Sequence, residues 1–192
     1  MTEWATYDYL SDALGKAIAY GYKSIKCDDV RKAFRNGKRL VYHRVKTPVP
    51  DKIPVFYTFA RTDKDEYIRT QLVLEGSEGD SYAGKVEDED MFYVIHSHAI
   101  NRFVERRQFH GSHEVAERHI INGLLINDVQ KDGTDETRYI YFDGGLFLCT
   151  VTDRVLHLRT FIMNRQCSPV QRMKSLTSEK NTEQLKREYG IK

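Results

Sequence analysis

The sequence predicts an α+β protein in which helices pack on an antiparallel β-sheet, preceded by an N-terminal extension of helix and strand. Two observations carry this prediction. Residues 98–106 have the periodicity of an amphipathic helix, and a second helical segment follows a glycine break. Residues 138–163 alternate apolar and polar side chains across two turn signals, as consecutive strands do. We therefore expect an extension (1–90), an α+β domain (91–165) and a polar tail (166–192).

Composition is that of an ordinary globular chain, with 40% hydrophobic residues, 30% charged residues and a net charge of +2. The sequence contains no long uncharged apolar run, so no membrane span is predicted. The N-terminal residues carry early acids and no apolar core segment, which is not typical of a secretory signal. Three cysteines are scattered without CxxC spacing, which favours reduced thiols and a cytoplasmic location.

The extension is predicted to begin with a helix over 7–20 and to continue with a short helix ending near Phe34. Asp28 or Asp29 can cap the short helix. The acidic segment 76–90 also contains glycine and serine, so we expect an exposed loop or linker there. Strands are expected over 39–46, 55–60 and 67–74.

The second half is predicted to start with a short strand over 91–95, followed by the helix that contains His98. Gly111 and Ser112 break that helix, and Ser112 can cap the next one. We expect the second helix to run from residue 113 to 122 and Gly123 to close it.

Three strands are predicted to follow, joined by tight turns. An Asp-Gly-Gly turn begins at Asp143, and a second turn covers 152–154. The predicted strands are 138–142, 146–151 and 155–163.

Four polar residues of the first of these helices share one face, namely His98, Arg102, Glu105 and Arg106. The positive charges of the arginines repel one another and do not favour a charged histidine, so this grouping adds little stability. It suits a phosphate group, because arginine binds phosphate through a planar fork and histidine exchanges protons near neutral pH. The alternative interpretation is an ordinary solvated helix face.

Two basic runs indicate an anionic partner in this nearly neutral chain. Residues 23–46 are rich in Lys and Arg, and residues 159–178 contain basic residues and no acid. Arg31, Lys32 and Arg35 share the outer face of the predicted short helix, so we expect them to contact phosphates. Each run also fits a solvated protein face.

Three features of the chain resemble the RegB-type endoribonucleases of T-even phages. They are the pattern His98-x-x-x-Arg102-x-x-x-Arg106, a second helix that carries His119, and a Gly-Gly hairpin. The pattern also resembles small domains that begin with His-Ala-x-x-Arg-x-x-Glu-Arg, and RegB is grouped with the RelE-type toxin ribonucleases. The resemblance covers about residues 93–163. It implies a toxin-like, phage-related hydrolase with a RelE/RegB-like fold, which cuts RNA without metal or cofactor and leaves a 2′,3′-cyclic phosphate. By position it implies catalytic roles for His98, Arg102 and His119.

RNA is the partner that the resemblance implies, with the ribosome or an inhibitor protein as further candidates. The chain departs from the family pattern in its first ninety residues and at His96, which forms a His-x-His with His98.

The chemistry is coherent without the resemblance. RNA carries its own nucleophile, the 2′-hydroxyl, so cleavage needs a base, an acid and positive charge near the phosphate. His98 and His119 can serve as base and acid in either order, beside Arg102. His157 and Arg159 alternate on one face of the last predicted strand and would join the site if that face looks toward the helix. With Arg106, they are the expected substrate-binding residues of this domain.

Three alternatives remain open. His119 follows Val115 and Ala116 at helical spacing, so it can be a core histidine. A metal site can form on His96-Ser97-His98 or on the His-x-x-His that begins at residue 110, but no acidic ligands accompany them and the arginines would repel a cation, so no metal is predicted. The domain can also be a non-catalytic module that binds RNA, DNA or a protein.

Overall fold

The computed structural model describes the protein from residue 6 onward, with gaps. The described residues are 6–13, 15, 32, 35–36, 40–45, 55–61, 68–75, 81–85, 91–126, 131–134 and 136–189. For the strands between residues 40 and 85 the description is of the backbone.

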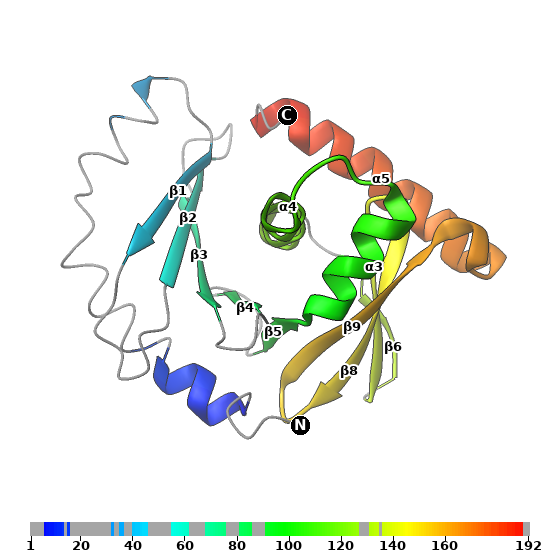
Figure 1. The fold of residues 1–192 in the computed structure, drawn as a ribbon, viewed down its shortest axis with the longest axis horizontal. Coiled ribbons are helices and arrows are strands. Elements are labelled where there is room, and N and C mark those ends of the chain that lie inside the picture. Colours follow the sequence, from blue (N-terminus) through cyan, green and yellow to red (C-terminus); the bar gives the residue numbers. More distant parts are fainter. Residues whose placement is uncertain are drawn as a thin grey trace.

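The described strands form one nine-stranded mixed sheet, and the predicted α+β class is confirmed (Figure 1). The strands are β1 (Leu40–Val45), β2 (Val55–Arg61), β3 (Ile68–Glu75), β4 (Ser81–Lys85), β5 (Phe92–Ile95), β6 (Lys131–Gly133), β7 (Thr137–Phe142), β8 (Gly145–Thr152) and β9 (Val155–Met163). Their order across the sheet is β1-β2-β3-β4-β5-β9-β8-β7-β6.

The prediction of a purely antiparallel sheet is wrong at one pair, because β5 and β9 run parallel. A parallel neighbour requires a long crossover. Here the crossover consists of two helices and the strands β6, β7 and β8, which return the chain to the edge of β5. All other neighbouring strands pair antiparallel.

The N-terminal strands extend the sheet, and their predicted positions are confirmed within one or two residues. The prediction of an exposed loop over 76–90 is wrong in its middle, because β4 occupies residues 81–85 and pairs with β3 and β5. Its sequence, SYAGK, contains little of the apolar alternation that signals a strand. The acidic residues that flank β4 lie outside the described residues.

Helices α3 (Ser97–Arg107) and α4 (His113–Ile126) occupy the predicted positions. Figure 1 shows α4 end-on within the curve of the sheet, with α3 between α4 and β9. Residues 7–13 are helical as predicted, and the remainder of the expected 7–20 helix lies outside the described residues except for Gly15, which is helical. None of the described helices is long and apolar enough to cross a membrane.

Phe103 of α3 lies at the centre of the buried core. Its ring centroid is 5.1 Å from that of Phe161 and 5.9 Å from that of Phe142. Tyr93 belongs to the same core, and burial, together with the nearby Cys149, raises the pKa of its hydroxyl far above the ordinary value. The core therefore joins α3 and α4 to one face of strands β5, β9, β8 and β7.

Both predicted hairpin turns are present. Asp143 and Gly144 have positive φ angles of 45° and 74°, and Asp153 and Arg154 have φ angles of 45° and 58°. Two consecutive residues with positive φ form the type I′ turn that matches the twist of paired strands. The guanidinium of Arg154 lies 3.5 Å from the centroid of the Tyr7 ring, which links the second turn to the N-terminal helix.

The predicted polar tail forms helix α5 (Pro169–Tyr189), preceded by a short 3-10 turn, η1 (Asn164–Gln166). The Ser168 hydroxyl accepts from the Gln171 amide N–H, and the Ser168 amide donates back to Gln171 Oε1. This reciprocal pair is a capping box that fixes the start of the helix. The Ser178 hydroxyl donates to the Tyr141 carbonyl at 2.8 Å and holds α5 against β7.

The prediction that Gly123 closes the second helix is wrong, because α4 continues through it to Ile126. A Cβ at Gly123 would lie 2.0 Å from Phe142 Cε2. Glycine is therefore needed here for the close packing of α4 on β7, and its position in a helix reflects that packing rather than an end signal.

We expect Gly123→Ala to lower the free energy of unfolding by about 1–3 kcal/mol, because overpacking outweighs the gain in helix propensity. Gly15→Ala is the matched control, since no atom lies within 4 Å of its added Cβ. The control should gain up to about 1 kcal/mol from helix propensity. Urea unfolding of both variants measures the difference, and a Gly123→Ala protein as stable as the parent would contradict the packing argument.

Candidate histidine–arginine site

Two histidines and an arginine meet where β5 passes into α3. His96 is the N-cap residue of α3, and its Nε2 lies 3.2 Å from His157 Nδ1 and 3.2 Å from Arg159 Nη1. The two imidazole rings stack with centroids 5.4 Å apart. We call His96, His157 and Arg159 the histidine–arginine cluster.

The parallel pairing of β5 with β9 creates this cluster. Ile95 lies opposite Leu158, so the chain leaves β5 beside residue 159. The His96 amide N–H continues the pairing by donating to the Leu158 carbonyl at 3.3 Å. His157 and Arg159 are therefore next to His96, although more than sixty positions separate them in the sequence.

A β-bulge sets the direction of the arginine. The register between β8 and β9 shifts at Leu148/Cys149, so Arg159 has no opposite residue on β8. Bulges redirect side chains in this way and are frequent beside functional sites. Arg159 Nε donates to the Thr150 hydroxyl at 3.0 Å, which fixes the guanidinium while Nη1 reaches His96.

The hydrogen bonds define where protons lie in the cluster. A guanidinium has no acceptor, so the contact from Arg159 requires an unprotonated Nε2 on His96. Nε2 has a single lone pair, which Arg159 Nη1 and His157 Nδ1 share, and the proton of neutral His96 is on Nδ1. His157 is only 3% exposed, whereas Arg159 is exposed and His96 is half-buried.

The electrostatic environment of the cluster favours an anion. No acidic residue lies in the first turn of α3, and the positive end of the helix dipole is at His96. Arg159 adds a full positive charge. The arrangement is suited to holding a phosphate oxygen next to an unprotonated imidazole nitrogen.

The predicted residues of α3 are distributed around the helix. His98 is exposed in the first turn. Arg102 Nη1 lies 2.7 Å from Glu105 Oε2, and both side chains are exposed enough for water to screen the pair. Arg106 donates to the Phe161 carbonyl on β9 and is half-buried, so it contacts the sheet rather than the face of His98.

His119 lies in a different environment. Its Nε2 is 3.0 Å from Asp143 Oδ2, and its ring packs against those of Phe103, Phe109 and Phe142 with centroids between 5.5 and 5.7 Å. The His119 side chain is 14% exposed and that of Asp143 is 5% exposed. These contacts match the core-histidine alternative.

His98 and His119 have different surroundings in the structure. Asp143, the partner of His119, also binds Arg107 Nη2 at 3.2 Å, and Arg107 ends α3. His98 lies nine positions earlier on that helix, about 13 Å along its axis at 1.5 Å per residue. His119 is thus held by Asp143, which is tied to the last residue of α3, whereas His98 is exposed in the first turn of that helix.

His96 is the site residue that the sequence interpretation assigned only to a metal alternative. The signal for its position was a histidine directly after a buried four-residue strand, one residue before the helix. His157 and Arg159 were predicted together with the helix, and the structure joins them to His96 rather than to His98.

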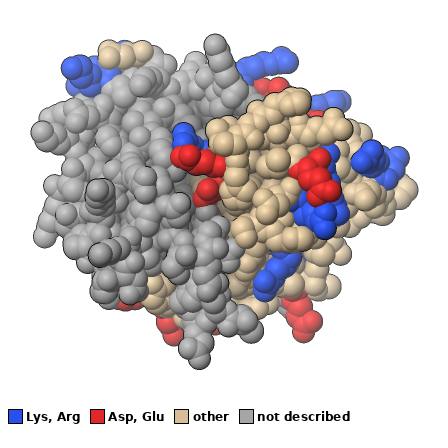
Figure 2. Space-filling model, in the orientation of Figure 1, with Lys and Arg blue, Asp and Glu red and all other residues tan. Residues whose placement is uncertain are grey.

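The predicted N-terminal phosphate contacts are only partly described. Lys32 and Arg35 are helical and exposed, and Arg31 lies outside the described residues. On the face shown in Figure 2, basic side chains of the described residues are scattered and several adjoin acidic ones. The described part of this face therefore presents isolated positive charges and not a continuous basic patch.

The described residues form neither a cluster of metal ligands nor a reactive cysteine site. It contains no group of three or more His, Cys, Asp or Glu residues arranged to hold a metal ion. Cys149 is buried and its thiol faces the Phe147 carbonyl. Burial raises the pKa of Cys167, against the opposing effect of Arg172, so this thiol stays protonated at neutral pH.

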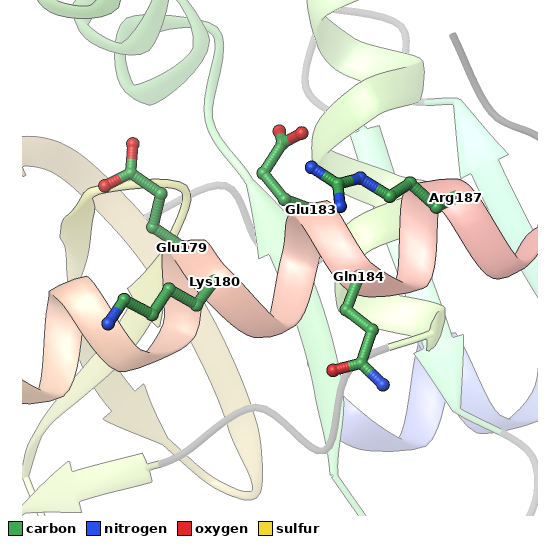
Figure 3. A pocket seen from close by; sticks show the side chains of 5 residues that line it. All are labelled: Glu179, Lys180, Glu183, Gln184 and Arg187. Carbon is green, nitrogen blue, oxygen red and sulfur yellow. The ribbon is translucent and has the colours of Figure 1, made fainter.

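A cavity of about 620 Å³ is lined, in its described part, by residues of α5 (Figure 3). Its described lining consists of Glu179, Lys180, Glu183, Gln184 and Arg187. Figure 3 shows Glu183 and Arg187 projecting to the same side of the helix and Gln184 to the other. This described lining mixes both signs of charge and contains no histidine, so it lacks the acid–base groups of the histidine–arginine cluster.

No protein-family model, curated protein or solved structure matches this chain.

We expect His119→Ala to lower the free energy of unfolding by about 1–3 kcal/mol, because it leaves the buried Asp143 carboxylate with one partner fewer. His98→Ala, at an exposed position, should change it by less than about 0.5 kcal/mol. Thermal and urea unfolding of the two variants test this contrast. Equal stability of both proteins would mean that His119 is not an anchor of the fold.

Proposed function

We propose that this protein is a metal-independent endoribonuclease that cleaves RNA at the histidine–arginine cluster, with the 2′-hydroxyl of the RNA as nucleophile. The observation that carries the proposal is the pair of 3.2 Å contacts from His96 Nε2 to His157 Nδ1 and Arg159 Nη1. These contacts put a proton acceptor beside a phosphate-binding fork. The reaction needs no cofactor.

Arg159 links binding to chemistry in this proposal. In the structure its Nη1 donates to His96 Nε2, the nitrogen that would accept a proton in the reaction. A charged phosphate oxygen is a stronger acceptor for a guanidinium than a neutral imidazole is. Phosphate binding therefore draws Arg159 away, and the lone pair of His96 Nε2 is then shared only between His157 Nδ1 and the 2′-hydroxyl.

The 2′-oxygen forms a bond to phosphorus while the bond from phosphorus to the 5′-oxygen breaks. His96 takes the 2′-hydroxyl proton, and protonated His98 gives a proton to the departing 5′-oxygen. The products are a 2′,3′-cyclic phosphate and a 5′-hydroxyl. His157 is buried and acts as a positioning residue that orients His96.

His98 is the proposed acid because it is exposed and lies two residues after His96. Arg102 continues the same face one turn further. Its pair with Glu105 is exposed and weak, so a phosphate can replace Glu105 at small energetic cost. Arg102 is thus proposed to bind a neighbouring phosphate, and exposed Lys32 and Arg35 to contact RNA further away.

The order of elements supports a distant RegB- or RelE-type relationship for residues 91–165. A strand, two helices and an antiparallel run of strands follow one another in the order that the resemblance implies. Under this proposal the phosphate chemistry is shared with that family, while the base is His96 and His119 has a structural role. The ribosome or an inhibitor protein would then be natural partners.

A non-catalytic RNA-binding module is the second candidate. The burial of His157 and the hydrogen bond between Arg159 and Thr150 favour it, since both features also fit a fixed structural cluster. Such a module would bind RNA at the same residues without cleaving it.

We expect RNA cleavage that persists in excess EDTA and does not occur with an all-deoxy oligonucleotide of the same sequence. The reason is that the 2′-hydroxyl is the nucleophile and no metal ion activates it. The 2′,3′-cyclic end is identified by mass spectrometry of the products. Cleavage that appears only when Zn²⁺ or Mg²⁺ is added would refute the metal-independent mechanism.

We expect His96→Gln to reduce the rate under saturating RNA by roughly 10²–10⁴-fold, as loss of a general base does. Arg159→Lys should reduce both kcat and affinity, because lysine cannot reproduce the planar fork. His110→Gln is the control, since this exposed histidine follows α3 and is not in the cluster.

Single-turnover cleavage and RNA affinity, measured in parallel on the three variants, separate the two candidate functions. Wild-type protein that binds RNA, loses affinity with Arg159→Lys and cleaves nothing would support the binding module. Full cleavage activity of His96→Gln would overturn the assignment of the base.

A further inference from the structure

Exposed apolar side chains gather on one helix. Among the described residues, the exposed large hydrophobic side chains are Val115, Val170, Met173 and Leu176, and the last three lie on α5. They are 63%, 72% and 41% exposed. Spacings of three residues put them on adjoining parts of one helix face. Single exposed apolar residues are common, but a group on one face indicates an interaction surface.

The remainder of α5 is fixed to the domain, so this face is held outward. Ser175 is fully buried, and the Ser178 hydroxyl binds the Tyr141 carbonyl. Further along, Glu179 Oε1 lies 3.4 Å from Arg107 Nη2. Figure 1 shows the first turns of α5 projecting beyond the ends of the neighbouring strands. The apolar face is thus presented by a helix whose rotation is set by the fold.

The projecting end of α5 is ordered by its own contacts. The capping box of Ser168 and Gln171 fixes its start. The Arg172 guanidinium donates to the Asn164 and Arg165 carbonyls and ties the helix to η1. A partner would meet a preformed helix, so association would not require folding of this segment.

The charges beside the first turns of the apolar face are positive, and Glu179, the first acid past that face, is paired with Arg107. Residues 159–178 contain no Asp or Glu. Arg165 and Arg172 are exposed beside the first apolar residues, and exposed Lys180 lies one turn past Leu176. The surface therefore has an apolar centre and a basic border, which complements an apolar surface with an acidic border.

We propose that Val170, Met173 and Leu176, together with Arg165, Arg172 and Lys180, form a docking surface for an acidic amphipathic helix of another protein. A helix with large apolar residues every three or four positions would pack along this face, and its flanking carboxylates would meet the basic border. The surface is separate from the histidine–arginine cluster and does not depend on the proposed ribonuclease function.

A second copy of the chain is a poorer occupant. An antiparallel α5 pair centred on Met173 would bring Arg172 of one copy near Lys174 of the other, with no acid in either segment. RNA is also disfavoured, because Val170, Met173 and Leu176 offer neither aromatic stacking nor hydrogen bonds to bases.

The experiment uses the full 192-residue chain and a fluorescent helical peptide with leucine at every third and fourth position and glutamate at the flanks. Binding is measured by anisotropy at low and high salt. We expect this peptide to bind at least about tenfold more tightly than a counterpart with lysine at the flanks. Met173→Gln and Leu176→Gln should each weaken binding by about tenfold.

Val115→Gln is the matched control, because it removes an exposed apolar side chain from α4 and should not change peptide affinity. Glutamine is a good helix former, so circular dichroism of the variants should match the parent. Equal affinity for acidic and basic peptides would overturn the proposal. So would concentration-dependent dimerisation that Met173→Gln abolishes, or binding to phosphatidylserine vesicles or RNA that depends on Met173 while the acidic peptide does not bind.

Discussion

The parallel pairing of β5 with β9 is the constraint on which both the sheet and the histidine–arginine cluster depend. Strands β1 to β4 join the remaining strands only through β5, and strands β6 to β8 join through β9. The same pairing puts His96 beside His157 and Arg159. Loss of this one ladder would divide the described strands into two sheets. It would also separate His96 from His157 and Arg159.

Two histidines of this chain show how neighbours determine a role. His119 contacts a buried carboxylate and three aromatic rings, and Asp143 also binds Arg107, which in turn contacts Glu179 of α5. A buried carboxylate needs such partners, so this group acts as an anchor of two helices, a hairpin and α5. His96 instead faces a second imidazole and an arginine, and those partners leave it suited to proton exchange near an anion.

Local patterns predicted most of the elements. The amphipathic face around Phe103 and the turn residues at Asp143 and Asp153 specified α3 and both hairpins, because these signals act within a few residues. β4 was missed because SYAGK is held by its two neighbours and carries little apolar alternation. The role of Gly123 depends on the Phe142 ring across the core, which no local pattern reveals.

The residue types of the candidate site were predicted from the sequence, but only some of the residues that form it were. His98, Arg102, His157 and Arg159 were identified from the chemistry that RNA cleavage needs. Two of them join His96, and the reason lies in a parallel register and a β-bulge that only the folded chain defines. Spacing along the helix connected His98 with Arg102, but it contained no information on which strand lies beside the helix start.

The central ladder also sets the order in which the protein can assemble. Ile95 and Leu158 become neighbours only after the intervening chain has been synthesised and folded into α3, α4 and the hairpins. Strands β1 to β4 leave the ribosome first, yet they reach the rest of the sheet through β5. The consecutive strands β1 to β5 can pair with one another as they emerge, but the second edge of β5 stays unpaired until β9 is made. Because long-range pairing is slow and unpaired edges favour aggregation, that edge is the exposed one during synthesis.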